Sequence, residues 1–189
     1  METVSFIHMA DGTREDYAFL EKHEAEYVKG LPTRVYEALQ KLEHSFSGYK
    51  VSRLTHSLQS ATRAMNDGRD DDYVVAALLH DIGDELAPYS HSEMAAAILR
   101  PFVSDKLYWI IKTHGVFQMY YYAHLTGGDQ HARERYRDNP WFDEAVEFCE
   151  HYDQNCFDPD FPTRPLDDFM PVLQRVLGRE PAFGETQTA

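Results

Sequence analysis

The stretch Tyr73-Val74-Val75-Ala76-Ala77-Leu78-Leu79-His80-Asp81-Ile82-Gly83 decides the fold of this chain. Six consecutive apolar residues indicate a buried helix, and Gly83 ends it just after two residues that can both bind a metal ion. Adjacent side chains on a helix diverge by about 100°, so His80 and Asp81 are poorly placed to chelate one ion. The Asp81 carboxylate has two oxygens, however, and can bridge two ions.

Further candidate ligands lie on both sides of this stretch, on or beside other apolar helical patterns: His56, His91, His114 and Asp153. A lone histidine on an apolar helix is more often a packed residue than a ligand, so the prediction depends on the whole set. Burying the ionised Asp81 carboxylate is costly unless it is paired or binds a metal. Four histidines and two aspartates on five predicted helices are what a two-metal site in a helical bundle requires.

The helical period recurs along the chain, and no run of five residues alternates as a strand would, so the predicted fold is all-α. Tyr17, Phe19, Leu20 and Tyr27 are the expected inward residues of the first helix. Helices are expected over 13–26, 32–43, from Ser52 past Ala61, over 73–81, over 90–99, from Ser104 through His114, over 141–153 and over 166–177.

Local signals set the predicted helix ends. Ser52 and Ser104 are expected N-caps, and Ser90 with Glu93 forms an expected capping box. The three prolines within 158–165 predict an irregular segment. Residues 1–12 and 178–189 are expected to be loose ends of one domain that spans residues 1–189.

Composition excludes several classes of protein. The chain of 189 residues is 43% hydrophobic, which is ordinary for a folded domain. It has neither a run of about 18 apolar residues nor a signal peptide, so we expect a cytoplasmic protein with no membrane partner. Its formal charge of −14 disfavours nucleic acid as a partner. Cys149 and Cys156 are expected to be reduced thiols.

The segment Leu78-Leu79-His80-Asp81-Ile82-Gly83 resembles the signature of the HD-domain superfamily of metal-dependent phosphohydrolases. His91 and His114, between this pair and Asp153, extend the likeness to its dinuclear members. The segment Gly48-Tyr49-Lys50-Val51-Ser52-Arg53-Leu54-Thr55-His56-Ser57-Leu58-Gln59 resembles the HD-domain mixed-valent diiron oxygenases that cleave organophosphonates. Within that family the chain is most similar to members that act on 1-hydroxy-2-(trimethylamino)ethylphosphonate.

The resemblance implies a single HD-domain bundle with two iron ions, Fe(II) and Fe(III), in its core. One ion would be held by His56, His80, Asp81 and Asp153. The other would be held by Asp81, His91 and His114, and substrate and O2 would bind there, which makes these three residues the expected catalytic ligands. The residue types alone do not select iron, because zinc, manganese or cobalt accept the same ligands.

The chain departs from the more distant aminophosphonate relatives at their substrate contacts. Asp84 stands where they have a histidine, and Gln118 stands where they have a lysine. Arg164 is the expected replacement for the phosphonate contact, chosen from Lys112, Arg133, Arg135, Arg137 and Arg164. Tyr49 is an expected lid or pocket wall. A quaternary ammonium would need aromatic faces, which Tyr120, Tyr121, Tyr122, Phe117, Tyr152 and Phe161 can supply, and Asp84 is a possible counter-charge.

The expected function is therefore O2-dependent cleavage of the C–P bond in a small organophosphonate that carries a quaternary or primary ammonium. The products would be glycine betaine, for the trimethylated substrate, and phosphate. The alternative enzyme is an HD-domain phosphohydrolase that acts on a phosphomonoester or nucleotide. A binding or signalling module without metal is the third interpretation.

Overall fold

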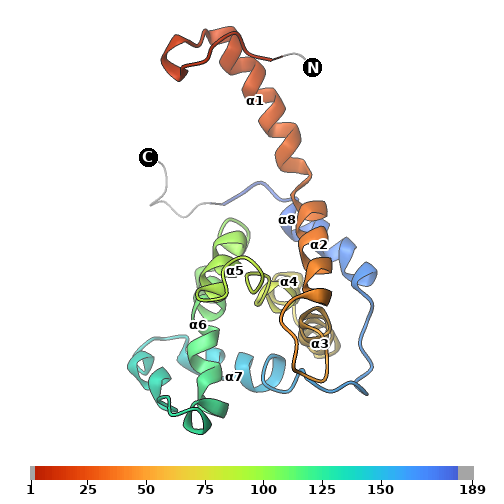
Figure 1. Ribbon diagram of the computed structural model, residues 1–189, viewed down its shortest axis with the longest axis vertical. Helices are drawn as coiled ribbons and strands as arrows, with labels where there is room; N and C mark the ends of the chain where they lie inside the picture. The colour runs from red at the N-terminus through yellow and green to blue at the C-terminus, as the bar shows by residue number, and fades with distance from the viewer. Residues whose placement is uncertain (1–2, 183–189) are drawn as a thin grey trace.

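A computed structural model describes residues 3–182 of the chain, and over this range the all-α prediction is confirmed, with no strand. The α-helices run in chain order as α1 Arg14–Lys29, α2 Leu31–Lys41, α3 Arg53–Asn66, α4 Asp71–Leu79, α5 His91–Leu99, α6 Asp105–Tyr122, α7 Phe142–Tyr152 and α8 Met170–Leu177 (Figure 1). Short 3-10 turns lie at Met9–Asp11, Leu42–His44, Ala123–Leu125, Ala132–Tyr136 and Leu166–Phe169.

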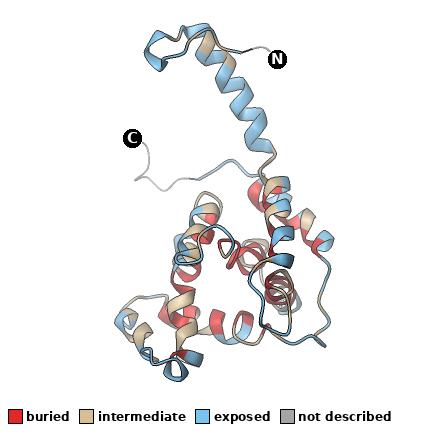
Figure 2. Ribbon diagram, viewed as in Figure 1, coloured by how far each residue is buried: buried red, intermediate tan, exposed pale blue. Residues whose placement is uncertain are grey.

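Helix α4 is the buried centre of the bundle. All of its residues from Val74 to Leu79 are at most 2% exposed, and the helix contacts α3, α6 and α8 (Figure 2). The Asp70 side chain caps it by accepting a hydrogen bond from the Tyr73 amide, and two acidic residues in the first turn favour the positive end of the helix. The apolar run therefore delivers His80 and Asp81 into the core.

The predicted caps at Ser52 and Ser104 are confirmed, and the capping box predicted at Ser90 is wrong, although α5 begins at His91 as expected. The Ser52 and Ser104 hydroxyls accept the amides of Thr55 and Leu107 at the starts of α3 and α6. The Ser90 side chain makes no capping hydrogen bond, so the predicted capping box is absent. The backbone at Ser90, with φ −148° and ψ 32°, lies outside the extended conformation that a capping serine adopts, and its carbonyl accepts the Glu93 amide instead.

Helix α1 forms as predicted, but its apolar side does not face the core. No residue of α1 is buried, and Tyr27 is 66% exposed. Only Gly30 separates α1 from α2, so α1 continues outward from the start of α2 and leaves the bundle (Figures 1 and 2). The prediction that Tyr17, Phe19, Leu20 and Tyr27 point inward is wrong for this reason.

Both ends of the chain are partly ordered. Residues Met9–Asp11 form a turn, and the Phe6 ring stacks on Tyr17. Residues 1–2 and 183–189, which belong to the expected loose ends, lie outside the described residues. The predicted last helix begins as a 3-10 turn and becomes α8 at Met170, because proline is tolerated only in a first helical turn and Pro171 occupies that position.

The prediction for the cysteines and the irregular segment is also confirmed. Cys149 and Cys156 are buried and free, as expected for reduced thiols. Residues 158–165 contain no helix, and they connect α7 to the last 3-10 turn. Between residues 3 and 182, no helix combines the length and the apolar character that a membrane span needs.

Candidate metal centre

The six predicted ligands meet inside the bundle, and five different helices or helix ends supply them. His56 lies on α3, His114 lies on α6, and His91 begins α5. His80 and Asp81 follow α4 directly, and Asp153 follows α7 directly. The His91 side chain is 26% exposed. The other five ligands are buried: His56, His80, Asp81, His114 and Asp153.

The Asp81 carboxylate lies between two pairs of histidines. Its Oδ2 is 3.2 Å from Nε2 of both His56 and His80. Its Oδ1 is 3.4 Å from Nε2 of His91 and 3.3 Å from Nε2 of His114. Each carboxylate oxygen therefore faces its own pair of imidazoles, and the arrangement can hold two ions that share Asp81.

Asp153 completes the half of the cluster that contains His56 and His80. Its Oδ1 is 3.4 Å from His56 Nε2 and 3.8 Å from His80 Nε2, and it accepts a 2.6 Å hydrogen bond from the Gln118 amide. Its Oδ2 is buried and has no hydrogen-bond partner among residues 3–182. An unpaired buried carboxylate oxygen is costly, so a cation fits this position.

Backbone carbonyls orient three of the imidazoles. The Nδ1 atoms of His80, His114 and His56 lie 2.7, 2.7 and 3.0 Å from the carbonyl oxygens of Ala77, Ile111 and Cys156. In the neutral imidazole the ring nitrogen that faces a carbonyl carries the proton, so Nε2 keeps the lone pair that would bind a metal ion. The Nε2 atoms of His56 and His80 are only 3.0 Å apart, and a cation between two such lone pairs would remove their repulsion.

Three polar residues close to the ligands in the sequence could accept the second ring proton of a histidine, and Asp84 is the one placed to do so. Asp84 lies near His91, with 3.6 Å between Oδ1 and Nδ1. Gln59 instead binds the backbone of Asp158 through both atoms of its amide, and Glu85 lines a groove between α2 and α5. For His80 and His114 the carbonyl partner lies three residues earlier in the same helical turn, so the sequence spacing was an available signal for these two contacts.

Arg53 is the functional candidate that the sequence did not indicate. It is the first residue of α3, it is only 8% exposed, and it forms ion pairs with Asp81 Oδ2 and Asp84 Oδ2. An arginine in the first turn of a helix is usually solvated, so its position in the sequence gave no signal. The nearby pair of buried carboxylates is the only hint, because each requires a positive partner.

Opposite charges within the cluster shift the pKa values of its own side chains. Burial raises the pKa of Asp81, but the His80 and Arg53 charges outweigh this and hold the pKa well below its usual value. Burial lowers the pKa of His80, but the Asp81 and Asp153 carboxylates outweigh it and raise the pKa well above its usual value. At His91 burial prevails over the Asp81 carboxylate, and the pKa is lowered. The His91 imidazole is therefore the readiest to act as a neutral ligand.

Gly83 sets the spacing between Asp81 and α5. A Cβ atom at this position would lie 2.7 Å from both the Cα and the carbonyl oxygen of His91. Backbone atoms cannot give way at that distance, so only glycine lets the chain lie against the first turn of α5. This contact holds His91 beside Asp81.

Two cavities open beside the cluster, on either side of α6. One of 470 Å³ is lined by His91 and by the cations Lys112 and Arg135, neither of which forms an ion pair within residues 3–182. The other, of 250 Å³, is lined by four aromatic rings and two glutamines: Tyr49, Tyr121, Tyr122, Phe157, Gln118 and Gln154. Gln118 and Tyr122 line both cavities.

Of the predicted substrate contacts, Tyr49 and Gln118 lie in these cavities, and Arg164 does not. The Arg164 guanidinium lies 3.7 Å from Asp168 in the last 3-10 turn, and its amide donates to the Thr62 hydroxyl. The irregular segment therefore runs along α3 and holds Arg164 away from the cluster. Asp84 is adjacent to the cluster, but Arg53 already neutralises it, so it is a weak counter-charge for an ammonium.

The aromatic prediction is likewise divided. Tyr121 and Tyr122 line the smaller cavity, together with Phe157, which stacks on the His56 ring with 4.4 Å between centroids. The other predicted rings have structural roles. Phe117 and Tyr152 are buried in the core, while Tyr120 and Phe161 lie against the guanidinium groups of Arg133 and Arg63.

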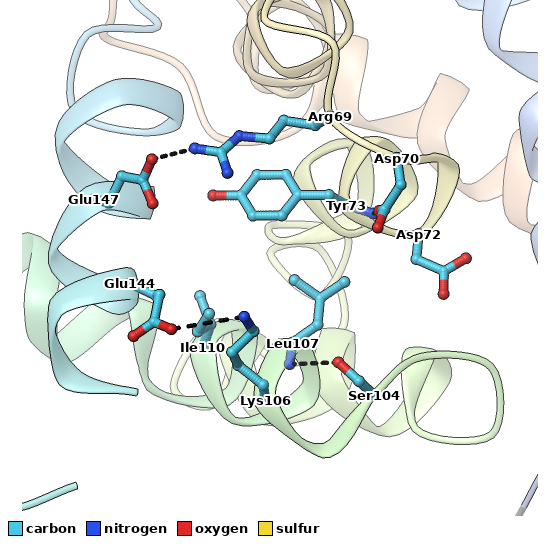
Figure 3. A pocket seen from close by; sticks show the side chains of 10 residues that line it. All are labelled: Arg69, Asp70, Asp72, Tyr73, Ser104, Lys106, Leu107, Ile110, Glu144 and Glu147. Carbon is cyan, nitrogen blue, oxygen red and sulfur yellow. Dashed lines mark hydrogen bonds and ion pairs between the residues drawn. The ribbon is translucent and has the colours of Figure 1, made fainter. Parts of the chain in front are cut away.

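A third cavity, of 280 Å³, lies between the starts of α4 and α6 and one face of α7, and contains none of the six candidate ligands (Figure 3). Its charged groups pair with one another, Arg69 with Glu147 and Lys106 with Glu144. Tyr73 points into it, and its buried hydroxyl has no partner among the described residues. This cavity is separate from the candidate metal centre.

Comparison with known families finds a likeness over slightly less than half of the chain. The family model described as HD domain matches residues 53–140, a range that contains five of the six candidate ligands and ends before Asp153. A search of curated proteins found no match. HD domains are generally metal-dependent hydrolases or related enzymes, and the buried cluster of histidines and aspartates fits a metal-dependent enzyme of this kind.

Proposed function

We propose that this HD-domain protein is a non-haem diiron oxygenase that cleaves the C–P bond of 1-hydroxy-2-(trimethylammonio)ethylphosphonate. The observation that carries the proposal is the Asp81 carboxylate, whose two oxygens each face a separate pair of histidines. The basic HD ligand set does not require His91 and His114. Their presence beside the second oxygen supports a dinuclear centre, and the resemblance of residues 48–59 to the diiron oxygenases supports the choice of oxygenase.

The proposed ligands form two groups that share Asp81. His56, His80 and Asp153 complete one group, and His91 and His114 complete the other. The iron pair, Fe(II) with Fe(III), would supply O2 activation and a site for the hydroxyl and one phosphonate oxygen of the substrate. Backbone carbonyls fix the imidazole tautomers, the Arg53 guanidinium neutralises Asp81, and the His91 half of the cluster faces the larger cavity.

Lys112 and Arg135 are the proposed contacts for the phosphonate end. Both line the cavity that reaches His91, and neither is committed to an ion pair within residues 3–182. They replace Arg164 in this role, because Arg164 lies beside Asp168 instead. Charge-assisted hydrogen bonds from such cations favour a phosphonate over a neutral ligand.

The smaller cavity is the proposed site for the trimethylammonium end. A quaternary ammonium has no N–H to donate, so aromatic faces recognise it better than hydrogen-bond acceptors do. Tyr49, Tyr121, Tyr122 and Phe157 provide four rings beside two neutral glutamine side chains. The shared lining residue Gln118 also holds Asp153, so this end of the substrate lies close to the proposed iron ligands.

The proposed reaction balances without another reductant. The C–P bond and the C–H bond of the hydroxyl-bearing carbon break, and that carbon becomes the carboxylate of glycine betaine. Phosphorus leaves as phosphate with release of one proton. One O2 supplies the two oxygen atoms that the products hold in excess of the phosphonate, and it accepts all four electrons.

The test is turnover by iron-loaded, full-length protein. We expect equal amounts of O2 consumed and phosphate released, with glycine betaine detected by mass spectrometry. A panel that contains the primary-amine analogue, phosphomonoesters and nucleotides checks the substrate. Hydrolysis of a phosphoester without O2 would assign the phosphohydrolase function instead, and less than one metal ion per chain would favour a non-catalytic module.

Two variants test the assignment of the phosphonate end. Replacing both cations, Lys112→Met with Arg135→Met, should raise KM for the phosphonate roughly tenfold or more, since each lost charge-assisted contact is worth about 1.5–3 kcal/mol. Arg137→Met is the matched control, because Arg137 is exposed on the same segment and pairs with Glu134. An unchanged KM in the double variant would refute this assignment.

A further inference from the structure

We propose that α1 is a dimerisation arm, and that in a pair of chains the α1 helix of each copy packs into the groove between α2 and α5 of the other. This inference concerns a surface remote from the candidate metal centre and is independent of the proposed function. Three observations support it: α1 is exposed, an apolar groove lies between α2 and α5, and the one-residue connection at Gly30 is too short for α1 to fold back into that groove.

Helix α1 exposes an apolar stripe that is not buried anywhere in the described part of the chain. Phe19, Leu20 and Tyr27 follow one another at helical spacing on one side of a 16-residue helix. No residue of α1 is buried, and Figure 2 shows the helix leaving the bundle as an exposed arm. Helices of this length are marginal in water, and most helical stability in proteins comes from packing an apolar face.

The arm is held in its outward direction. The Arg34 guanidinium donates a 2.7 Å hydrogen bond to the Tyr27 carbonyl and lies 3.8 Å from the centre of the Tyr27 ring. Gly30 is the one residue between the two helices, so this contact spans their joint. The arm is therefore presented to a partner in a fixed direction, which lowers the entropy lost on binding.

The groove lies at the base of the arm. Val35 and Ala38 of α2 face Met94 and Ile98 of α5 across a cavity of 180 Å³. Leu86 also lines it and is 76% exposed. Such a concave apolar strip is suited to an amphipathic helix.

The chain cannot fill this groove with its own arm. A helix that folds back along its neighbour needs a connection of about two to five residues, whereas Gly30 alone separates α1 from α2. A second copy of the chain has the same arm without this restriction. Two copies related by a twofold axis would exchange arms. Each arm would then fill the groove of the other copy, and both grooves would be occupied.

Charge supports this choice of occupant. Residues 14–29 contain five acidic and three basic side chains, which gives the arm a net charge of −2. The groove has Arg34 and Lys41 against the single acid Glu85. An acidic arm and a basic groove on the same chain favour association between copies.

The experiment is sedimentation equilibrium on the full-length protein over a range of concentrations. Wild type should sediment as a dimer. Leu20→Asp in the arm and Leu86→Asp in the groove should each shift the mass to that of a monomer, with unchanged helical circular dichroism. The matched controls should remain dimeric: Ala25→Asp lies on the opposite side of α1, and Leu125→Asp replaces a leucine that is also 76% exposed, on a different turn.

Mixing the two monomeric variants distinguishes arm exchange from any other interface. The Leu86→Asp chain keeps an intact arm and the Leu20→Asp chain keeps an intact groove, so the mixture should recover a heterodimer held by one exchanged arm. A monomeric wild type would overturn the proposal. So would a dimer that survives both substitutions, or a mixture in which no heterodimer forms.

Discussion

Asp81 is the side chain on which the other members of the cluster depend. It lies within 3.4 Å of the Nε2 atoms of four histidines, and Arg53 pairs with it as well. Asp153 comes within 3.8 Å of His56 and His80, and it lies within 4.8 Å of His114, so Asp81 is the carboxylate with the closest contacts to both halves. Loss of the Asp81 carboxylate should therefore affect both proposed ion positions.

The corresponding prediction is that Asp81→Ala loses bound metal. We expect metal content after dialysis to fall at least about tenfold, because loss of even an outer partner of a ligand typically costs 10- to 100-fold in affinity. Elemental analysis of the purified protein measures this. The control variants His8→Ala and His44→Ala, at exposed positions outside the cluster, should retain the wild-type content. Full occupancy in the Asp81 variant would contradict the proposed centre.

At this scale the sequence identified which residues meet, but not what supports them. The types and order of His56, His80, Asp81, His91 and His114 pointed to one cluster, and the structure brings them together. Arg53 and the carbonyl partners were missed, because they depend on distances between elements that only folding determines. The Asp168 partner of Arg164 was missed for the same reason, since nothing in the sequence tells along which helix its loop runs.

At the scale of helices, the N-terminus of α1 is capped by several side-chain hydrogen bonds. Thr13 and Asp16 form a capping box, and the Asp16 carboxylate also accepts the amide and hydroxyl of Ser5. Backbone hydrogen bonds from Ser5 and Thr13 lower the pKa of Asp16 from 3.8 to about 2. A depressed pKa means that the ionised carboxylate stabilises the folded state.

We predict that this capping contribution is complete above pH 4 and is lost as pH falls toward 2. The sign follows because the unfolded chain binds the Asp16 proton at a higher pH than the folded chain does. The protection factors of the first-turn amides of α1, which compare the observed exchange rate with the intrinsic rate at the same pH, should fall several-fold over this range. The Asp16→Asn variant should show the lower protection already at pH 6, whereas Glu24→Gln in the middle of the helix should not.

Helix starts were predictable where a serine or aspartate adopts the extended conformation, as at Ser52 and Ser104. Ser90 has the same residue type but a different backbone, set by the turn that follows Gly83. The stripe on α1 was identified as apolar, but periodicity cannot tell whether the surface it packs against belongs to the same chain. Tertiary contacts decide both cases.

At the scale of the whole molecule, α2 and α8, which are far apart in sequence, contact each other beside the central helices. Both contact the bundle near α3 and α4, and Leu39 of α2 is fully buried among them. The all-α class followed from the uniform helical period. Which helices pack together did not, because similar apolar stripes on α2, α3 and α8 give no pairing information.

We predict that Leu39→Ala destabilises the whole domain by about 2–5 kcal/mol, as large-to-small changes in a core typically do. The loss should appear in urea unfolding followed by circular dichroism as a lower midpoint in a single transition. Leu125→Ala, at a side chain that is 76% exposed, should change the free energy of unfolding by less than about 0.5 kcal/mol. Equal effects of the two substitutions would show that α2 is not part of the cooperative unit.

The close contact at Gly83 has a consequence for how this protein can vary. Because α5 is anchored to the chain at Gly83 and His91, the length of residues 85–89 does not set the position of His91. Tyr89 at the end of this segment borders the larger cavity. Insertions or deletions there can reshape the cavity mouth without moving Asp81, so ligand preference can diverge during evolution while the buried cluster stays constant.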